Sequence, residues 1–116
     1  MNIERIDHLV LTVRDINVTC EFYVRVLGMQ VVTFADFRIA LQFGQQKINL
    51  HELGQEFEPK ATYPTPGSAD ICLITSTPLS EAREHIINCG VEIIAGIVTR
   101  TGALGVSNCS LISAHI

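Results

Sequence analysis

The feature that most constrains the fold of this sequence is an internal repeat at an offset of 62 residues. His8 precedes Gly28 by twenty residues, and Asp70 precedes Gly90 by the same interval. Similar apolar positions recur at this offset, pairing Leu9 with Ile71, Leu11 with Leu73, Val24 with Ile86 and Val31 with Ile93. Such self-similarity predicts one supersecondary unit that is used twice.

The first copy of the repeat predicts a β-α-β-β-β order. Residues 3–13 alternate and are rich in β-branched side chains, which is typical of a strand. Asp15 is a good N-cap for the helical pattern that follows, and Gly28 is its predicted stop. Three short strands are then expected at 29–36, 37–43 and 47–53.

The second copy follows a linker at about 55–68, which contains three prolines and one glycine. A short apolar strand is predicted at 69–75, and Thr77–Pro78 is a suitable N-cap and N1 pair for a helix that ends at Gly90. Strands are expected at 91–100 and, more weakly, at 106–116. We therefore expect one α+β domain, with module one at about 3–54 and module two at about 69–116.

Charge and hydropathy exclude several classes of protein. The net charge is −4 and no Lys/Arg cluster occurs, which disfavours binding to nucleic acid or to an anionic membrane. No apolar run approaches the roughly 18 residues of a membrane span, and the start "MNIERID" has no apolar signal region. The four cysteines form no C-x-x-C pair, so buried reduced thiols are expected. These features predict a cytoplasmic protein.

Two histidines raise the possibility of a metal site. Alternation places His8 opposite Leu9 and Leu11 of its strand, and His51 opposite Ile48 and Leu50. If the sheet curls, both imidazoles meet in its concave face, where a transition metal is usually completed by a carboxylate and water. The alternative is an ordinary strand histidine, solvated or hydrogen-bonded.

Asp70 occupies the repeat position of His8. It is a candidate metal ligand, an acceptor that orients an imidazole, or a turn residue at the end of the linker. His85 lies on the more polar side of a predicted helix and is interpreted as solvated.

The stretch "IDHLVLTVRDINVTCEFYVRVLGMQVV" resembles the opening of the vicinal-oxygen-chelate superfamily, which contains glyoxalases, bleomycin-resistance proteins and dioxygenases. "KINLHELGQEFEPKA", "PGSADICLIT" and "RTGALG" narrow the resemblance to a bacterial glyoxalase-like subgroup that includes a virulence-associated lactoylglutathione-lyase-like protein. The resemblance covers about residues 3–106.

The resemblance implies paired βαβββ modules that form an open, cupped sheet around a divalent metal, Ni, Zn, Mn or Fe. It implies His8 and His51 as ligands and Asp70 near a ligand position of the second module. The expected activity is isomerase/lyase or oxygenase chemistry on a small molecule through a metal-chelated oxyanion. The alternative is a non-catalytic protein that binds a small, antibiotic-type ligand on the same fold without a functional metal site.

The last residues depart from the family pattern. "VSNCSLISAHI" stands where the family carries a "DPDGN" turn and a strand with a glutamate ligand. We expect the second module to be truncated, with an exposed edge that favours a homodimer. "ISAH" matches "INLH" at an offset of 64, which makes His115 a candidate ligand. Arg100 is either a solvated strand-end residue or a ligand for a carboxylate or phosphate at the mouth of the cleft.

Overall fold

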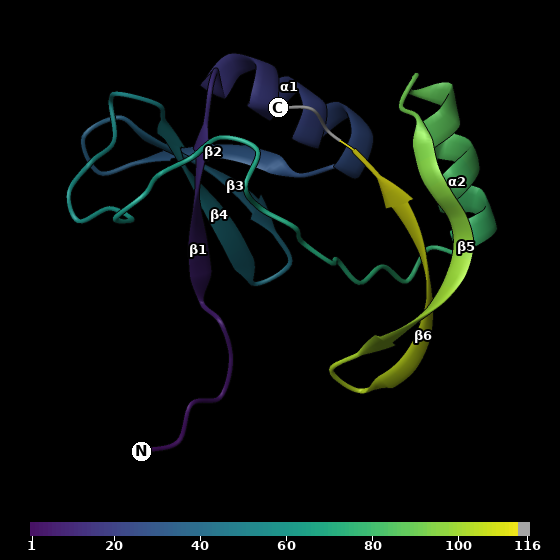
Figure 1. Ribbon diagram of the computed structural model, residues 1–116. Helices are drawn as coiled ribbons and strands as arrows, with labels where there is room; N and C mark the ends of the chain where they lie inside the picture. Colours follow the sequence, from purple (N-terminus) through teal and green to yellow (C-terminus); the bar gives the residue numbers. More distant parts are fainter. Residues whose placement is uncertain (114–116) are drawn as a thin grey trace. The chain divides into compact units, whose positions relative to one another are not determined.

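The computed structural model describes residues 1–113 and divides them into two compact units (Figure 1). The first unit is Met1–Asp70, and the second begins at Ile71. The described residues contain two helices and six strands in open sheets. The α+β class expected from the sequence is therefore confirmed, and each unit is described by itself.

The first unit has the predicted β-α-β-β-β order. Its sheet runs β1-β4-β3-β2, with β1 parallel to β4 and the other two pairs antiparallel. Helix α1 covers one face of this sheet (Figure 1). The elements are β1 (His8–Val13), α1 (Ile16–Leu27), β2 (Gln30–Phe34), β3 (Arg38–Phe43) and β4 (Gln46–Glu52).

Both ends of α1 are formed by the residues that the sequence predicts. The Asp15 side chain accepts a hydrogen bond from the backbone N–H of Val18 at 3.0 Å. At the other end Gly28 is left-handed, with φ 67°, and its N–H bonds to the last carbonyls of the helix. A residue without a Cβ adopts this conformation at little steric cost, which explains the stop.

The first strand is shorter than the sequence predicts. It begins at His8 instead of residue 3, because its only partner is β4 and the register starts with His8 opposite Lys47. Residues 1–7 have no strand to pair with and are exposed. Alternation alone does not reveal where a partner begins.

The buried core lies in the first unit. Apart from Ala40, which lies on the opposite face of the sheet, its apolar members pack between α1 and the sheet face that carries Leu41, Ile48 and Leu50. Burial of each such side chain is worth roughly 1.5–3 kcal/mol. Among the described residues, the buried apolar side chains are Val13, Phe22, Val26, Met29, Ala40, Leu41, Ile48 and Leu50.

The second unit is simpler than the first. It contains α2 (Leu79–Asn88), β5 (Ile93–Gly102) and β6 (Gly105–Ile112), with the two strands antiparallel and α2 against them. The predicted strand at 69–75 is wrong, because these residues are not paired. Its counterpart β1 pairs only with β4, and the described part of the second unit has no equivalent of β4.

The ends of α2 differ from expectation by one residue. Pro78 is the N-cap, with no side-chain cap hydrogen bond, where Thr77 was predicted. Cys89 is the C-cap, and Gly90 follows in the left-handed conformation with φ 78°. Neither helix within residues 1–113 has the length and apolar character needed to cross a membrane.

None of the four cysteines, all of which lie within residues 1–113, forms a disulfide. Cys20, Cys89 and Cys109 are half-buried and Cys72 is exposed, so the expectation of buried thiols is met only in part by the first three and is wrong for Cys72. The reason is the missing strand at 69–75, since an unpaired segment does not bury its side chains against a sheet.

Candidate functional site

The sheet of the first unit has one apolar and one polar face. The strand registers place matching residues of β1, β4 and β3 side by side on the face opposite α1. We call this the polar face. It consists of His8, Val10 and Thr12 of β1, Lys47, Asn49 and His51 of β4, and Arg38, Ala40 and Gln42 of β3.

One end of the polar face is covered by Phe57, from the segment after β4. The guanidinium carbon of Arg38 lies 4.7 Å from the centroid of the Phe57 ring, a cation–π distance. The His51 ring meets the same phenyl group edge-on, with 5.8 Å between centroids. Arg38, His51 and Phe57 are called the Arg38 cluster below.

The environment of His51 keeps its imidazole neutral at pH 7. The side chain is buried, at 6% exposure. Burial lowers the pKa of His51 below 6.5, and the positive charge of Arg38 lowers it further. Glu56 and Glu58 act in the opposite direction and Lys60 in the same direction, with smaller effects.

Two buried polar atoms of this face lack a protein partner. They are Nε of Arg38 and Oδ1 of Asn49. A buried polar atom left without a hydrogen bond costs about 1–3 kcal/mol. Native structures contain few such atoms, and a water, an ion or another bound molecule commonly satisfies them.

The other end of the polar face surrounds His8. Its Nδ1 lies 2.7 Å from Oδ1 of Asp7, and this hydrogen bond is the main reason that the pKa of Asp7 is lowered. The Lys47 ammonium lies 3.8 Å from the centroid of the Phe34 ring. The exposed carboxylate of Asp7 and the half-buried ammonium of Lys47 therefore both occupy this end.

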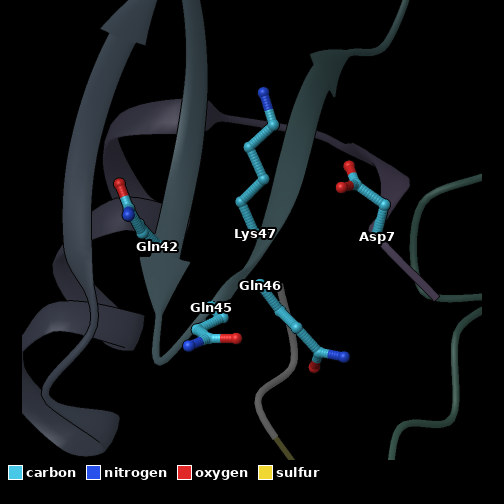
Figure 2. A pocket seen from close by; sticks show the side chains of 5 residues that line it. All are labelled: Asp7, Gln42, Gln45, Gln46 and Lys47. Carbon is cyan, nitrogen blue, oxygen red and sulfur yellow. The ribbon is translucent and has the colours of Figure 1, made fainter. Parts of the chain in front are cut away.

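A shallow pocket of about 200 Å³ opens beside His8. Figure 2 shows Asp7, Gln42 and Lys47 projecting from three neighbouring segments, with Gln45 and Gln46 at the β3–β4 turn. The Gln46 amide donates a hydrogen bond to the carbonyl of Ile6 at 3.2 Å. All five lining residues are polar or charged, which suits water or a small polar group.

The structure places His8 and His51 on one face, as their strand phases predict, but does not bring them together. His8 lies opposite Lys47, whereas His51 lies opposite Thr12. This offset of four residues amounts to roughly 13 Å at about 3.3 Å per residue. Two imidazoles that share one ion must each lie about 2.0–2.1 Å from it. The ligand pair does not fit a single metal within this unit.

The other predicted ligands do not supply the missing partners in the described residues. Asp70 is an exposed residue at the end of the first unit, and Arg100 is an exposed residue of β5 in the second. His115 lies outside the described residues. Within residues 1–113, no group of three or more His, Cys, Asp or Glu side chains could hold a metal ion. These metal and anion assignments stay predictions.

Three site residues are missing from the sequence-based prediction. Arg38 and Asn49 were treated only as parts of strands, and Phe57 only as part of a linker. The strand phase of 37–43 does place Arg38 on one face with Ala40 and Gln42. An arginine in a mostly apolar strand was therefore a signal that could have marked Arg38 as a site residue. Nothing in the pattern of 55–68 predicts that Phe57 reaches it.

The first unit defines an α+β protein built on a βαβββ module with a polar open face. The profile of the Glyoxalase/Bleomycin resistance protein/Dioxygenase superfamily matches residues 5–106. The chain belongs to this superfamily, as the resemblance seen in the sequence implied.

The chain is similar to proteins from bacteria and a fungus. It is 59% identical over 105 residues to the virulence protein STM3117 of Salmonella typhimurium, covering 90% of this chain and 73% of that protein. It is 48% identical over 105 residues to the glyoxalase domain-containing protein RDO1 of Mycosarcoma maydis, covering 90% of this chain and 59% of that protein.

Solved structures show the same fold. The crystal structure of STM3117 matches with a TM-score of 0.95 and 56% identity, over 97% of this chain and 89% of that one. The integron cassette protein VCH_CASS1 from the V. Cholerae mobile metagenome also matches with a TM-score of 0.95, at 55% identity, over 97% and 88%.

Proposed function

We propose that this chain binds a small molecule on the polar face of its first unit. The observation that carries the proposal is the pair of buried, unpartnered polar atoms on that face, Nε of Arg38 and Oδ1 of Asn49. Membership of a superfamily whose members bind small molecules supports it. This is the ligand-binding alternative of the sequence analysis, and it requires no metal.

A fragment screen by NMR tests this function. The uniformly ¹⁵N-labelled chain is mixed, in the presence of EDTA, with several hundred fragment-sized molecules of neutral, anionic and cationic type. We expect the hits to perturb backbone amides of β3 and β4, and to raise the midpoint of thermal unfolding by mass action. Hits that map only to the apolar face or to the second unit would overturn the proposal, as would a screen without hits.

A metal-dependent lyase, isomerase or dioxygenase is the second candidate function. The observation that favours it is the common face of His8 and His51, together with the chemistry found in the superfamily. Because the two side chains do not fit one ion within the unit, such a site needs a group supplied from elsewhere, such as Asp70, His115 or a second copy of the chain.

Metal analysis distinguishes the two candidates. A metal enzyme retains about one divalent ion per site after purification, and both His8→Ala and His51→Ala lose it. His85→Ala is the matched control, because this histidine lies in α2 of the other unit. A chain that takes up no Ni²⁺, Zn²⁺, Mn²⁺ or Fe²⁺ contradicts the enzyme and leaves the binding function standing.

We also propose an oligomeric state for this chain. Superfamily members commonly form dimers, and we propose a homodimer for this chain. Analytical ultracentrifugation at micromolar concentration checks it, and a monomer under these conditions would contradict it. A cytoplasmic location stays a prediction from the sequence.

A further inference from the structure

Arg38 is a cation of the polar face that has no carboxylate partner within residues 1–113. It is the first residue of β3, and its Nε–H is buried without an acceptor. Among residues 1–113, the ion pairs are His8 with Asp7 and Arg25 with Glu21, so Arg38 has no carboxylate partner there. A guanidinium stays charged at all physiological pH values, so its charge is not removed by deprotonation.

Phe57 holds this guanidinium in a defined position. The cation–π contact at 4.7 Å uses none of the N–H donors of the guanidinium in a strong hydrogen bond, because a ring face accepts only weakly. An arginine held by such a contact loses rotamer freedom in advance, so less freedom is lost when its N–H donors bind a ligand. The ring thus orients Arg38 without neutralising it.

No neighbouring carboxylate within residues 1–113 forms an ion pair with Arg38, although Glu56 and Glu58 lie near enough to His51 to act on its pKa. His51 is buried beside the same ring, and Glu56 uses its carboxylate to accept the backbone N–H of Gly54 at 3.1 Å. Asn49, two residues before His51 on β4, adds an acceptor that also lacks a partner. The polar face therefore carries the Arg38 guanidinium, which has no ion-pair partner within residues 1–113. It also carries Oδ1 of Asn49, which can accept a hydrogen bond from a donor group.

We propose that the Arg38 cluster binds the oxyanion of the ligand, so that the ligand is a small molecule bearing a carboxylate, phosphate or phosphonate group. The two N–H donors on one side of a guanidinium match two oxygens of such a group. Oδ1 of Asn49 accepts a hydroxyl or amine hydrogen of the same molecule. This inference rests on the proposed function and names the class of ligand.

The direct test follows the Arg38 Nε–H resonance by ¹H–¹⁵N NMR in the full chain, with the signal assigned by its loss in Arg38→Lys. Sodium phosphate, sodium acetate and neutral acetamide are titrated separately at constant ionic strength. We expect a saturable downfield shift of this resonance with at least one of the two anions and none with acetamide. The anion that saturates at the lower concentration distinguishes a phosphate-type ligand from a carboxylate.

Three variants make the test specific. Arg38→Lys keeps the charge but loses the fork, and we expect anion affinity to fall by about tenfold, measured through the His51 backbone amide. Phe57→Leu keeps the arginine but removes its stacking partner, and we expect a loss of several-fold. Arg14→Lys is the control, because Arg14 is an exposed arginine after β1, and its affinity should equal that of the wild type.

The outcomes separate this inference from the proposed function. The oxyanion assignment is wrong if neither anion shifts the Arg38 Nε–H resonance. It is also wrong if the shift of this resonance does not saturate, the behaviour expected of the exposed Arg14 side chain. Fragment hits on β3 and β4 in that case would leave the binding function intact. Anion affinity that is unchanged in both Arg38→Lys and Phe57→Leu would also overturn the assignment.

Discussion

The carboxylate of Glu52, at the end of β4, accepts a hydrogen bond from the backbone N–H of Ile16, the first residue of α1, at 3.1 Å. These residues lie 36 positions apart, so the contact joins the start of the helix to the far strand of the same module. The first turn of α1 contains no acidic residue of its own. Together with the N-cap Asp15, Glu52 therefore supplies negative charge where the N-terminal end of a helix favours it.

Removing this contact should destabilise the first unit. We expect Glu52→Ala to lower the free energy of unfolding by about 1 kcal/mol, the usual loss for a helix cap, and Glu52→Gln to lower it by less because an amide oxygen still accepts. Urea unfolding followed by circular dichroism measures both. Glu21→Ala is the control, since its exposed pair with Arg25 one turn away is worth only about 0.3–0.5 kcal/mol. Equal losses in Glu52→Ala and Glu21→Ala would contradict the capping role.

The turn between β2 and β3 makes a second prediction about stability. Ala35, Asp36 and Phe37 all have positive φ values, of 21°, 53° and 66°. This region costs a residue with a side chain roughly 1–2 kcal/mol, and glycine adopts it freely. Phe37 is 89% exposed, so its ring contributes no core packing that could offset the cost.

We therefore expect Phe37→Gly to be more stable than Phe37→Ala by about 1 kcal/mol. The alanine variant is the matched control, because it removes the same ring but keeps the Cβ that causes the strain. Urea unfolding of the two variants gives the difference directly. A Phe37→Gly chain less stable than Phe37→Ala, as glycine is at ordinary strand positions, would show that the turn is not left-handed in solution.

Most of the first unit could be predicted from the sequence because its signals are local. Asp15 and Gly28 mark the ends of α1 through their own side-chain and backbone chemistry. The prediction of a strand at 69–75 is wrong because strand formation depends on a non-local partner. Its apolar residues resemble those of β1, but a strand also needs a partner, and no local pattern shows whether a partner exists.

In the candidate site, too, the features set by local sequence could be predicted and those set by non-local contacts could not. The phase of His8 and His51 follows from the twofold repeat of a strand, and the structure agrees with it. Their offset of four residues depends on the register between two strands joined through α1, β2 and β3, which alternation does not determine. The stacking of Arg38 on Phe57 depends on the path of an irregular segment after β4.

Alkaline pH should destabilise the first unit through Tyr23. Burial in α1 raises the pKa of this phenol above 10.0, because the phenolate would lose its hydration. The unfolded chain therefore ionises first, so stability is full below pH 10.0 and falls as the pH rises toward the raised pKa. Urea unfolding at a series of alkaline pH values should show this decline, and Tyr23→Phe should reduce it.

The same titration can be observed optically. The chain has one other tyrosine, Tyr63, which is exposed, so Tyr63→Phe isolates the phenolate absorbance of Tyr23. We expect its midpoint to lie above 10.0 in the folded chain and to return toward 10.0 in urea. A folded midpoint at or below the urea value would contradict the burial of this ring.

Cysteine alkylation gives the last prediction. Cys72 is exposed, whereas Cys20 is half-buried in α1 and burial raises the pKa of its thiol above 9.0. Because the thiolate is the reactive form, iodoacetamide at mildly alkaline pH should modify Cys72 well before Cys20, and the rate at Cys20 should keep rising beyond pH 9.0. Peptide mass spectrometry at timed intervals measures both rates, and Cys72→Ser should remove the faster phase. Unfolding in urea should bring the two rates together, and a folded chain in which Cys20 reacts as fast as Cys72 would show that α1 does not shield this thiol.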